Sequence, residues 1–264
     1  MQTEMEDNCL NCNRSILENF CSNCGQKKYK RIDKKYIWDE IQYTTIHTNK
    51  GFLYSVKSIL KSPGKTAREY IDGDRINHYK PIALAFILSG ISAFISYKVI
   101  GMDTIMKESY SNQNMGSDLM KSYMSFVSSY SSIMMLLLIP LFAVFTRLAF
   151  RKWGQNYYEH IVMNAFGLSS FTIISILVAF PILYIVRQNP TLFTQISMFS
   201  ILLVPLIMVW FYKGFYQDRT SKSIILRVLL ILLMGFVCYL ILIFAVVIYF
   251  VVTRPEALQY VQPK

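Results

Sequence analysis

The hydrophobic residues of this chain are concentrated in long runs that begin at Pro81, whereas the residues before Pro81 are mostly polar and basic. A helix needs about 20 consecutive apolar residues to cross the hydrocarbon core of a bilayer. The runs after Pro81 approach or exceed that length, which predicts membrane-spanning helices and disfavours the buried helices of a large soluble core. The five predicted spans cover residues 81–100, 131–150, 161–186, 195–212 and 224–252, and a tail follows at 253–264.

The connection between the third and fourth predicted spans has two interpretations. Residues 187–194 are a short outer loop if both runs cross the membrane, or the turn of a re-entrant pair if neither does. The composition agrees with a membrane protein in both cases, because only 16% of the residues are charged, whereas a soluble domain has about 25%. The five runs contain no acidic residue, which disfavours a proton-coupled transporter.

The basic residues predict how the spans are oriented. Short loops rich in Lys and Arg stay in the cytoplasm. If the N-terminus is cytoplasmic, 21 of the 27 Lys and Arg residues lie on the inner side. Five spans then place the C-terminus outside. No apolar run begins near Met1, so we expect no cleavable signal peptide.

Four of the five cysteines form two C-x-x-C pairs near the N-terminus, within a predicted head at residues 1–28. Cys9 and Cys12 make the first pair, and Cys21 and Cys24 make the second. Two such pairs can surround one metal ion tetrahedrally, and four thiolates suit Zn²⁺ best. We therefore predict a zinc ribbon with one structural zinc per chain, because four protein ligands leave no open position for chemistry.

Other interpretations of the cysteines are an iron–sulfur cluster, a rubredoxin-like iron and a pair of disulfides. A reducing cytoplasmic compartment disfavours the disulfides. The basic run at 27–35 follows the head directly. Anionic lipid headgroups attract such a run near a membrane surface, so we expect lipid rather than nucleic acid as its partner.

Residues 29–80 are patterned as amphipathic helices rather than as a flexible tether. A helix is expected to begin at Asp33, and another follows Lys50. Lysines occupy one face of the second helix, which predicts a helix lying in the inner interface or docked on the spans. The predicted apolar face consists of Phe52, Leu53, Val56, Ile59 and Leu60.

The chain is expected to stop and restart within this region. Ser62 can cap a new helix whose first residue is Pro63, and Gly73 can end it. Tyr79 is expected to anchor at the interface before the first span. We expect Arg68 and Arg75 to bind lipid phosphates or the exposed carbonyls at the ends of spans, because a guanidinium donates paired hydrogen bonds.

The stretches "CSNCGQ" (residues 21–26) and "GFLYSVKSILKSPGKTAREYIDGDRINHYKP" (residues 51–81), followed by hydrophobic spans, carry a resemblance. They are similar to a bacterial family of uncharacterised multi-span membrane proteins with an N-terminal zinc ribbon. The resemblance covers most of residues 9–90, departs at Asn13 and Asp74, and implies an architecture in a bacterial inner membrane without implying an activity. The motif residues that it carries over are Phe52, Pro63, Gly64, Arg68, Tyr70, Gly73, Arg75, Tyr79 and Pro81. A looser similarity links the chain to the Yip1-like superfamily, whose eukaryotic members bind small GTPases.

Three functions remain open at this point. No familiar catalytic motif is present, so the first prediction is a non-enzymatic adaptor that recruits an unknown cytoplasmic protein. The second is a permease, channel or lipid-handling protein with a groove lined by Asn164, Ser169 and Ser170. The third is a membrane enzyme, for which Asp72, Asp74, Glu159 and His160 are the available set. The oligomeric state is left open.

Overall fold

The structure is a computed structural model, and it describes residues 8–16, 18–28, 31–34, 36–37, 51–105 and 118–253. Within these ranges the regular secondary structure is helical, apart from two isolated β-bridges, Asn8↔Ser15 and Phe20↔Lys27. This confirms the prediction of an all-α protein with a small cysteine-rich head. The helix expected from Asp33 and the tail expected after Thr253 lie mostly outside the described residues.

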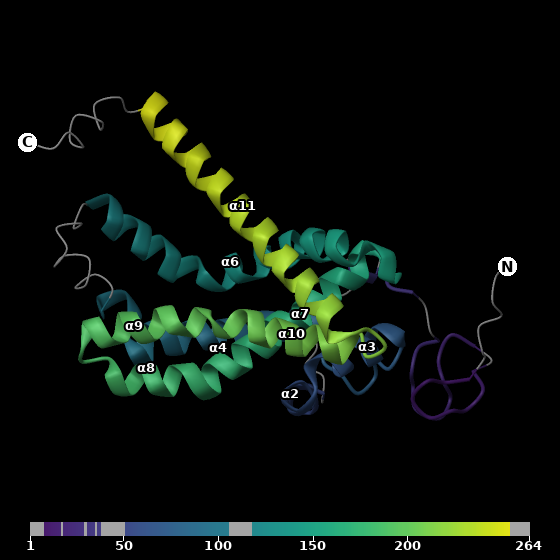
Figure 1. Cartoon of the computed structure of the whole chain (residues 1–264). Helices are drawn as coiled ribbons and strands as arrows, with labels where there is room; N and C mark the ends of the chain where they lie inside the picture. The colour runs from purple at the N-terminus through teal and green to yellow at the C-terminus, as the bar shows by residue number, and fades with distance from the viewer. Residues whose placement is uncertain are drawn as a thin grey trace, which may run out of the picture.

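Five helices are long and apolar enough to cross a membrane, as predicted. Several of them are composite, because π-helical or 3₁₀ turns continue an α-helix. The elements are α4 (Pro81–Phe94) with η1 (Ile95–Ile100), α6 (Asp118–Phe150) with η2 (Arg151–Trp153), α7 (Tyr157–Ile174) with η3 (Ser175–Ala179) and α8 (Phe180–Val186), α9 (Pro190–Ile201) with α10 (Leu203–Phe215), and α11 (Ser221–Thr253). Figure 1 shows α11 crossing the bundle obliquely, with its C-terminal half extending away from the other helices.

The third and fourth spans are joined more tightly than the sequence predicts. Pro190 begins α9, and the Asn189 side chain caps it by accepting from the Leu192 backbone N–H at 3.1 Å. The fourth span therefore extends over Pro190–Phe215 and not only over 195–212. The polar Thr and Gln residues in its first turns hide this start from a hydropathy window. Both helices of the pair have enough length for full spans, which favours a loop at 187–189 over a re-entrant pair.

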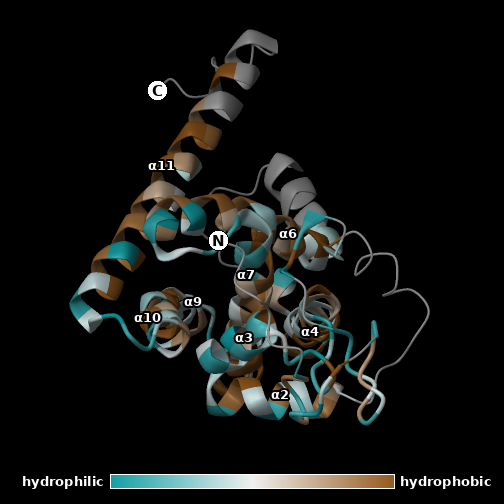
Figure 2. Ribbon diagram, turned by 90° about the vertical axis from the view of Figure 1, so that its right-hand side faces the viewer, coloured by the Kyte–Doolittle hydropathy of each residue, from teal (hydrophilic) through white to brown (hydrophobic). Residues whose placement is uncertain are grey.

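Helix α7 lies at the centre of the bundle. It packs against α4, α6, α3 and α2, and Figure 2 shows it among them. Its N-terminus is held by a capping box, in which Asn156 accepts from the Glu159 backbone N–H and Glu159 accepts from the Asn156 backbone N–H. Small buried residues such as Ala165 and Ser169 let the neighbouring helices approach closely.

Two short helices precede the spans and are packed against them. Helix α2 (Phe52–Lys61) contacts α7, and α3 (Pro63–Asp72) contacts α7 and α10. As predicted, Ser62 is the N-cap residue of α3, although its hydroxyl makes no capping bond, and Gly73 ends the helix with a φ of 127°. A Cβ on Gly64 would lie 1.9 Å from the carbonyl oxygen of Phe211, so only glycine fits this crossing.

The buried face of α2 differs from the predicted one. Ile59 is buried and Phe52 and Val56 are half-buried, but Leu53 is 77% exposed and Leu60 is also exposed. Ser55 takes the central buried position instead, and its hydroxyl accepts from the Tyr79 backbone N–H at 2.7 Å. Leu53 and Leu60 lie on a stripe about 100° around the helix from Phe52 and Ile59. The α2 helix is therefore docked on the spans, which was one of the two interpretations of its pattern.

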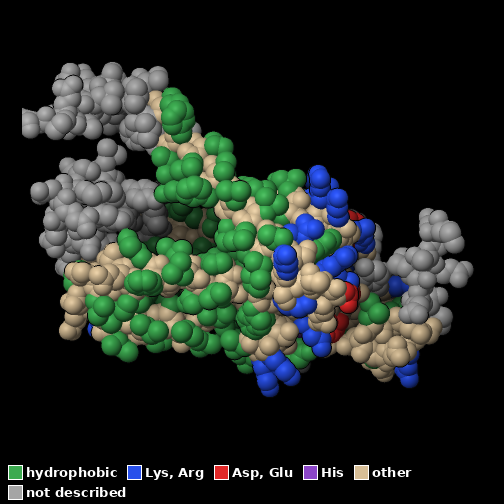
Figure 3. All heavy atoms as spheres, in the orientation of Figure 1, with side chains coloured by type: hydrophobic (Ala, Val, Ile, Leu, Met, Phe, Trp, Pro, Cys, Tyr) green, Lys and Arg blue, Asp and Glu red, His purple; other side chains and the backbone are tan. Residues whose placement is uncertain are grey.

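The surface divides into an apolar body and a charged end. Figure 3 shows hydrophobic side chains over most of the bundle, whereas Lys and Arg gather at the end that carries α2, α3 and the head. Large exposed apolar residues on the outward faces include Phe199, Leu206 and Phe236. Such an apolar surface suits contact with lipid and agrees with the prediction of a multi-span membrane protein.

Candidate functional site

The four N-terminal cysteines converge as their spacing predicts. Their Sγ atoms all lie within 4.8 Å of one another. The Sγ atoms of Cys9 and Cys24 are 3.5 Å apart, as are those of Cys12 and Cys21. In a tetrahedral site with metal–sulfur bonds of about 2.3 Å, the sulfurs lie about 3.8 Å apart. The four thiols therefore fit a single metal ion, and all its ligands would come from this chain.

Each cysteine pair sits on a tight turn with the same backbone pattern. In the first turn Cys9 N–H donates to the Arg14 carbonyl at 2.8 Å, and Asn13 N–H donates to the Cys9 carbonyl at 2.7 Å. Cys21, Gly25 and Gln26 repeat these bonds in the second turn. Asn13 has a φ of 60° and Gly25 a φ of 74°. Asn tolerates this left-handed conformation better than most residues, so Asn13 preserves the first turn without a glycine.

The surroundings of the thiols already favour two of the four thiolates that a metal requires. The backbone N–H of Arg14 and the Asn23 side chain lower the pKa of Cys12 to about 6. The Asn11 side chain lowers the pKa of Cys24. Burial raises the pKa of Cys9 to about 11. A bound cation would supply the charge that deprotonates Cys9.

The cysteine head is docked onto the connection between α3 and α4. Gln26, which directly follows the second cysteine turn, is buried, and its side-chain amide donates to the carbonyl of Gly73. The Asn77 amide donates to the Asn11 side chain at 2.8 Å. The C-G-Q part of the motif therefore contacts the glycine that ends α3.

A second set of contacts joins the segment after the head to the start of α7. Arg31 Nε donates to Glu159 Oε1 at 2.8 Å, and Arg31 Nη2 donates to the Gly154 carbonyl at 2.8 Å. The Asn156 amide donates to the carbonyl of Ile32 at 3.0 Å, and the Ile32 side chain is buried. Arg31 and Glu159 are 128 residues apart in the chain, so no local pattern predicts this ion pair.

The motif residues around α3 form a packed cluster rather than an open lipid-binding face. Tyr70 is buried, its ring lies edge-on to Phe166 at 5.4 Å, and its hydroxyl is hydrogen-bonded to that of Tyr36. Arg75 Nε donates to the Tyr70 carbonyl at 3.1 Å, and its guanidinium carbon lies 4.9 Å from the Tyr36 ring. Arg75 thus caps the end of α3 and not the end of a span.

One further prediction for this region is corrected. Tyr79 was expected as an interface anchor, but it is buried edge-on to Phe52 with their ring centroids 5.8 Å apart. Arg68 is paired with the carboxylate of Asp72 at 2.6 Å, because both lie on the same face of α3 four residues apart, and its expected binding to lipid phosphate stays a prediction. His78 is buried beside Tyr54 and Tyr70.

The groove predicted on α7 exists only in part. Asn164 lines a cavity of about 250 Å³ between α6, α7 and α10, and its amide donates to Thr146 Oγ1 at 2.9 Å and to the His160 carbonyl at 2.7 Å. Ser169 and Ser170 are buried and do not line this cavity. Ser169 lies about 140° around the helix from Asn164, so it points to a different neighbour.

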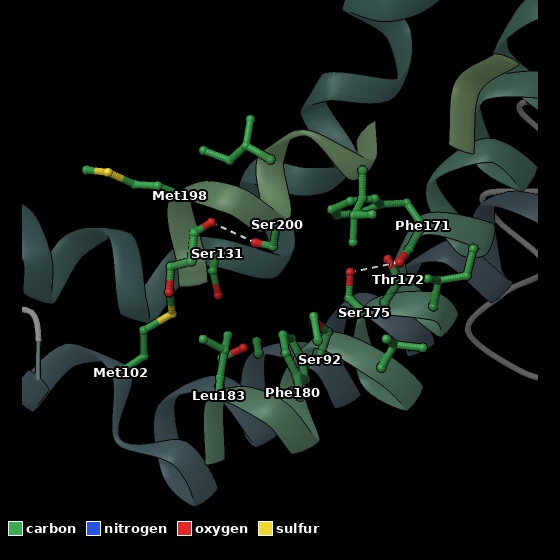
Figure 4. A pocket seen from close by; sticks show the side chains of 18 of the residues that line it. Ser92, Met102, Ser131, Phe171, Thr172, Ser175, Phe180, Leu183, Met198 and Ser200 are labelled. Atoms are coloured by element: carbon green, nitrogen blue, oxygen red, sulfur yellow. Dashed lines mark hydrogen bonds between the residues drawn. The ribbon is translucent and has the colours of Figure 1, made fainter. Parts of the chain in front are cut away.

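A larger cavity, which the three predicted groove residues do not line, lies among α4, η1, α6, α7, η3, α8, α9 and α10. Its volume is about 660 Å³, and Figure 4 shows hydroxyl side chains converging on it from several helices. Thr172 and Ser175 donate to carbonyls of their own helix at 2.8 and 2.9 Å, which leaves their oxygen lone pairs toward the cavity. The hydroxyl residues in its lining include Ser92, Ser96, Ser131, Thr172, Ser175, Thr194 and Ser200. Thr194, Ser197 and Ser200 recur every three residues along α9, and this pattern was the feature of the sequence that could have indicated a polar cavity.

The residues considered for catalysis have separate partners. Glu159 is paired with Arg31, and Asp72 is paired with Arg68. His160 is fully buried, and its ring is stacked on that of Phe150 with centroids 6.4 Å apart. Asp74 lies near His78 and partly opposes the effect of burial, which lowers the pKa of that histidine.

Comparison with known families agrees with the predicted resemblance over one part of the chain. A family model described as "Protein of unknown function (DUF3667)" matches residues 49–93. These residues comprise α2, α3 and most of α4. They include Gly73 and Arg75, which lie between α3 and α4. No curated protein and no solved structure is significantly similar to the chain.

Proposed function

We propose that this protein is a non-enzymatic membrane adaptor, in which a cytoplasmic zinc head is held at the inner face of the spans and recruits a cytoplasmic protein. The observation that carries the proposal is docking at two separate places, of the head through Gln26 on Gly73 and of the segment that follows it through Arg31 on Glu159. A head that only stabilised the N-terminus would not need a fixed orientation. A recognition surface benefits from a fixed orientation, because binding then loses less conformational entropy.

The metal in this proposal is one structural zinc per chain, bound by Cys9, Cys12, Cys21 and Cys24. The buried apolar part of the head is small, since Ile16 packs with little besides the cysteines. Metal binding would therefore supply much of the folding free energy of the head. Iron in the same four-sulfur site is the alternative, and metal analysis of the purified protein distinguishes the two.

The head presents two large apolar side chains that suit a protein partner. Leu10 is 54% exposed and Phe20 is 59% exposed, and each lies next to one of the cysteine turns. Arg14 and Lys27 are exposed nearby. Apolar and aromatic residues with a basic rim favour a partner with a matching apolar patch and acidic surroundings.

The head faces the cytoplasm in this proposal, and the C-terminus lies outside the inner membrane. The gathering of Lys and Arg at the head's end supports this orientation, because basic residues are retained on the cytoplasmic side. Reporter fusions after Lys30 and after Lys264 should report opposite compartments. The same compartment for both would contradict the five-span topology.

The partner surface is tested by photo-crosslinking in cells followed by capture of the full-length protein. We expect the Leu10→Ser and Phe20→Ser double variant to lose about tenfold of the captured partner, since apolar anchors dominate such interfaces. Leu53→Ser is the matched control, because Leu53 is an exposed leucine outside the head. Capture of the same proteins in equal amounts by both variants would contradict the adaptor proposal.

A second candidate function is lipid or small-molecule handling, and the 660 Å³ cavity favours it. Its hydroxyl lining suits a ligand with an uncharged polar group and an apolar body. Replacement of Ser175 by Phe would fill part of the cavity, whereas replacement of the exposed Ser221 by Phe would not. Loss of a co-purifying lipid only in the Ser175→Phe variant, measured by mass spectrometry, would favour this function over the adaptor.

A further inference from the structure

A cavity at the charged end of the bundle combines basic, aromatic and hydroxyl side chains. It has a volume of about 420 Å³ and lies between α3, η2 and the connection from α10 to α11. Lys65, Arg68, Trp153, Tyr216 and Arg219 line it. None of the functions considered above uses these five residues together.

We propose that this cavity binds a phosphate group, either as the headgroup of an anionic phospholipid or as a soluble phosphate. The ligand would be bound by the membrane domain itself and not by the cysteine head. It goes beyond the adaptor function and does not depend on it.

The cationic groups are held in place by aromatic rings. The guanidinium carbon of Arg219 lies 5.2 Å from the centre of the Trp153 ring, and that of Arg68 lies 5.6 Å from the Phe215 ring. Arg227 lies 4.3 Å from the same Trp153 ring. A guanidinium stacked in this way keeps its N–H edge available for the paired hydrogen bonds that a phosphate accepts.

Tyr216 supplies the polar group that points to a ligand. It is only 5% exposed, it lines the cavity, and its hydroxyl has no hydrogen-bond partner within the described parts of the chain. A buried hydroxyl without a partner is destabilising. Burial raises the pKa of Tyr216, so the hydroxyl keeps its proton and can donate to a phosphate oxygen.

The carboxylate of Glu69 lines the same cavity, and that of Asp72 pairs with one of the lining cations without lining the cavity itself. Glu69 is paired with Lys65 at 3.6 Å, and Arg68 is paired with Asp72 at 2.6 Å. All four of these side chains are more than 40% exposed. Ion pairs at such exposure contribute little, so a phosphate can compete for both cations. Asp218 adds one further negative charge to the lining, which favours a singly charged diester over a doubly charged phosphate.

The frame of the cavity is fixed before any ligand arrives. Lys213 Nζ donates to the carbonyls of Gln217 and Arg219 at 3.2 and 2.7 Å, which holds the loop after α10. Trp153 and Phe215 are the last residues of two of the helices that are long and apolar enough to cross a membrane. The cavity therefore lies at the depth where lipid headgroups begin, and a lipid could enter it from the membrane side.

The test uses the full-length protein in detergent and measures binding by titration calorimetry. The probes are dihexanoyl phosphatidylglycerol, dihexanoylglycerol, which lacks the phosphate, and inorganic phosphate. The variants are an Arg68→Gln and Arg219→Gln double variant and Tyr216→Phe. Lys222→Gln is the matched control, because Lys222 is an exposed cation in the first turn of α11, directly after the same connection, and does not line the cavity.

We expect phosphatidylglycerol to bind about tenfold or more weakly to the double variant, since it loses charge-assisted bonds. Tyr216→Phe should weaken binding about fivefold, and Lys222→Gln should change it less than twofold. Inorganic phosphate that binds with the same variant pattern would support the site and identify a soluble ligand. Phosphatidylglycerol binding without phosphate binding would support a lipid ligand.

Three results would overturn the proposal. Equal binding of dihexanoylglycerol would mean that the phosphate is not recognised. An equal loss in Lys222→Gln would mean attraction by diffuse charge only, and unchanged binding in the double variant would remove the site. If the double variant does not fold, Tyr216→Phe decides alone, because it keeps the ring and its packing.

Discussion

Gly64 and Gly214 face each other where α3 crosses α10, and a Cβ on Gly214 would lie 3.3 Å from the Cα of Gly64. The two backbones meet because neither residue has a side chain. This contact joins Gly64, in the Pro63-Gly64-Lys65-Thr66 stretch that belongs to the family resemblance, to the end of the fourth span. The motif is therefore a packing device that brings α3 against the bundle.

We expect Gly64→Ala to destabilise the protein by about 3 kcal/mol, at the upper end of overpacking costs, because its Cβ would meet backbone atoms of Phe211 and Phe215. Gly90→Ala is the control, since a Cβ there meets nothing within 4 Å. In α4 that control should be neutral or stabilising by up to about 1 kcal/mol. Thermal unfolding in detergent measures both. Equal stability of the two variants would show that α3 and α10 do not approach as described.

Cys21→Ser should reduce the zinc content from one ion per chain to less than about a tenth of that, because three thiolates hold a structural zinc much less tightly. Cys238→Ser should leave the zinc unchanged, since Cys238 lies in α11, outside the four-cysteine cluster. Elemental analysis of the purified variants measures this. Zinc retained at the wild-type level in Cys21→Ser would refute the metal site.

Arg31→Gln should loosen the docked head. Glu159 is almost fully buried, whereas the Arg31 side chain is 58% exposed, so we expect the pair to contribute about 1 kcal/mol. Spin labels at Ser22 and Lys152 would report a broader distance distribution in this variant. Arg14→Gln is the control, because Arg14 is bonded to Asn23 within the head. Glu159→Gln should match Arg31→Gln, since Gln preserves the capping box of α7 while removing the charge.

The stability of the protein should fall as the pH drops below about 6.5, in part because of His78. Burial lowers the pKa of His78 in the folded protein, although Asp74 and Glu69 oppose this effect. Below the ordinary pKa, the unfolded chain binds a proton that the folded chain does not, so the free energy of unfolding decreases by at most about 1.4 kcal/mol per pH unit.

The measurement for His78 is the difference between the wild type and His78→Gln, because the other titratable groups contribute in both proteins. The stability of the variant should depend less steeply on pH below about pH 6.5. Parallel curves for the two proteins would assign the pH dependence to other groups.

The sequence predicts those features that depend on neighbours in the chain. The five spans follow from the length of apolar runs, the cysteine cluster follows from its spacing, and the end of α3 follows from Gly73. Each of these needs only local chemistry and a single helical or turn geometry.

The features that the sequence did not predict depend on which face of a helix meets another helix. Ser55 rather than Leu53 is buried on α2, and Ser169 is packed away from the cavity that Asn164 lines. The pairing of Arg31 with Glu159 joins segments that are far apart in the chain. An amphipathic pattern gives several candidate faces, and the packing of the whole bundle selects one of them.

Glu159 belongs to the capping box at the N-terminus of α7 and also forms the ion pair with Arg31. These two roles have a consequence for the order in which the contacts form during synthesis. The cysteine head and Arg31 are synthesised before α7, and Glu159, the partner of Arg31, is made 128 residues after Arg31. The contacts of the head with Gly73 and Asn77 can form earlier, but docking at both places is complete only after α7 has been made. A cellular partner that recognises the seated head would therefore select molecules whose third span is already in the membrane, so recruitment would wait for assembly.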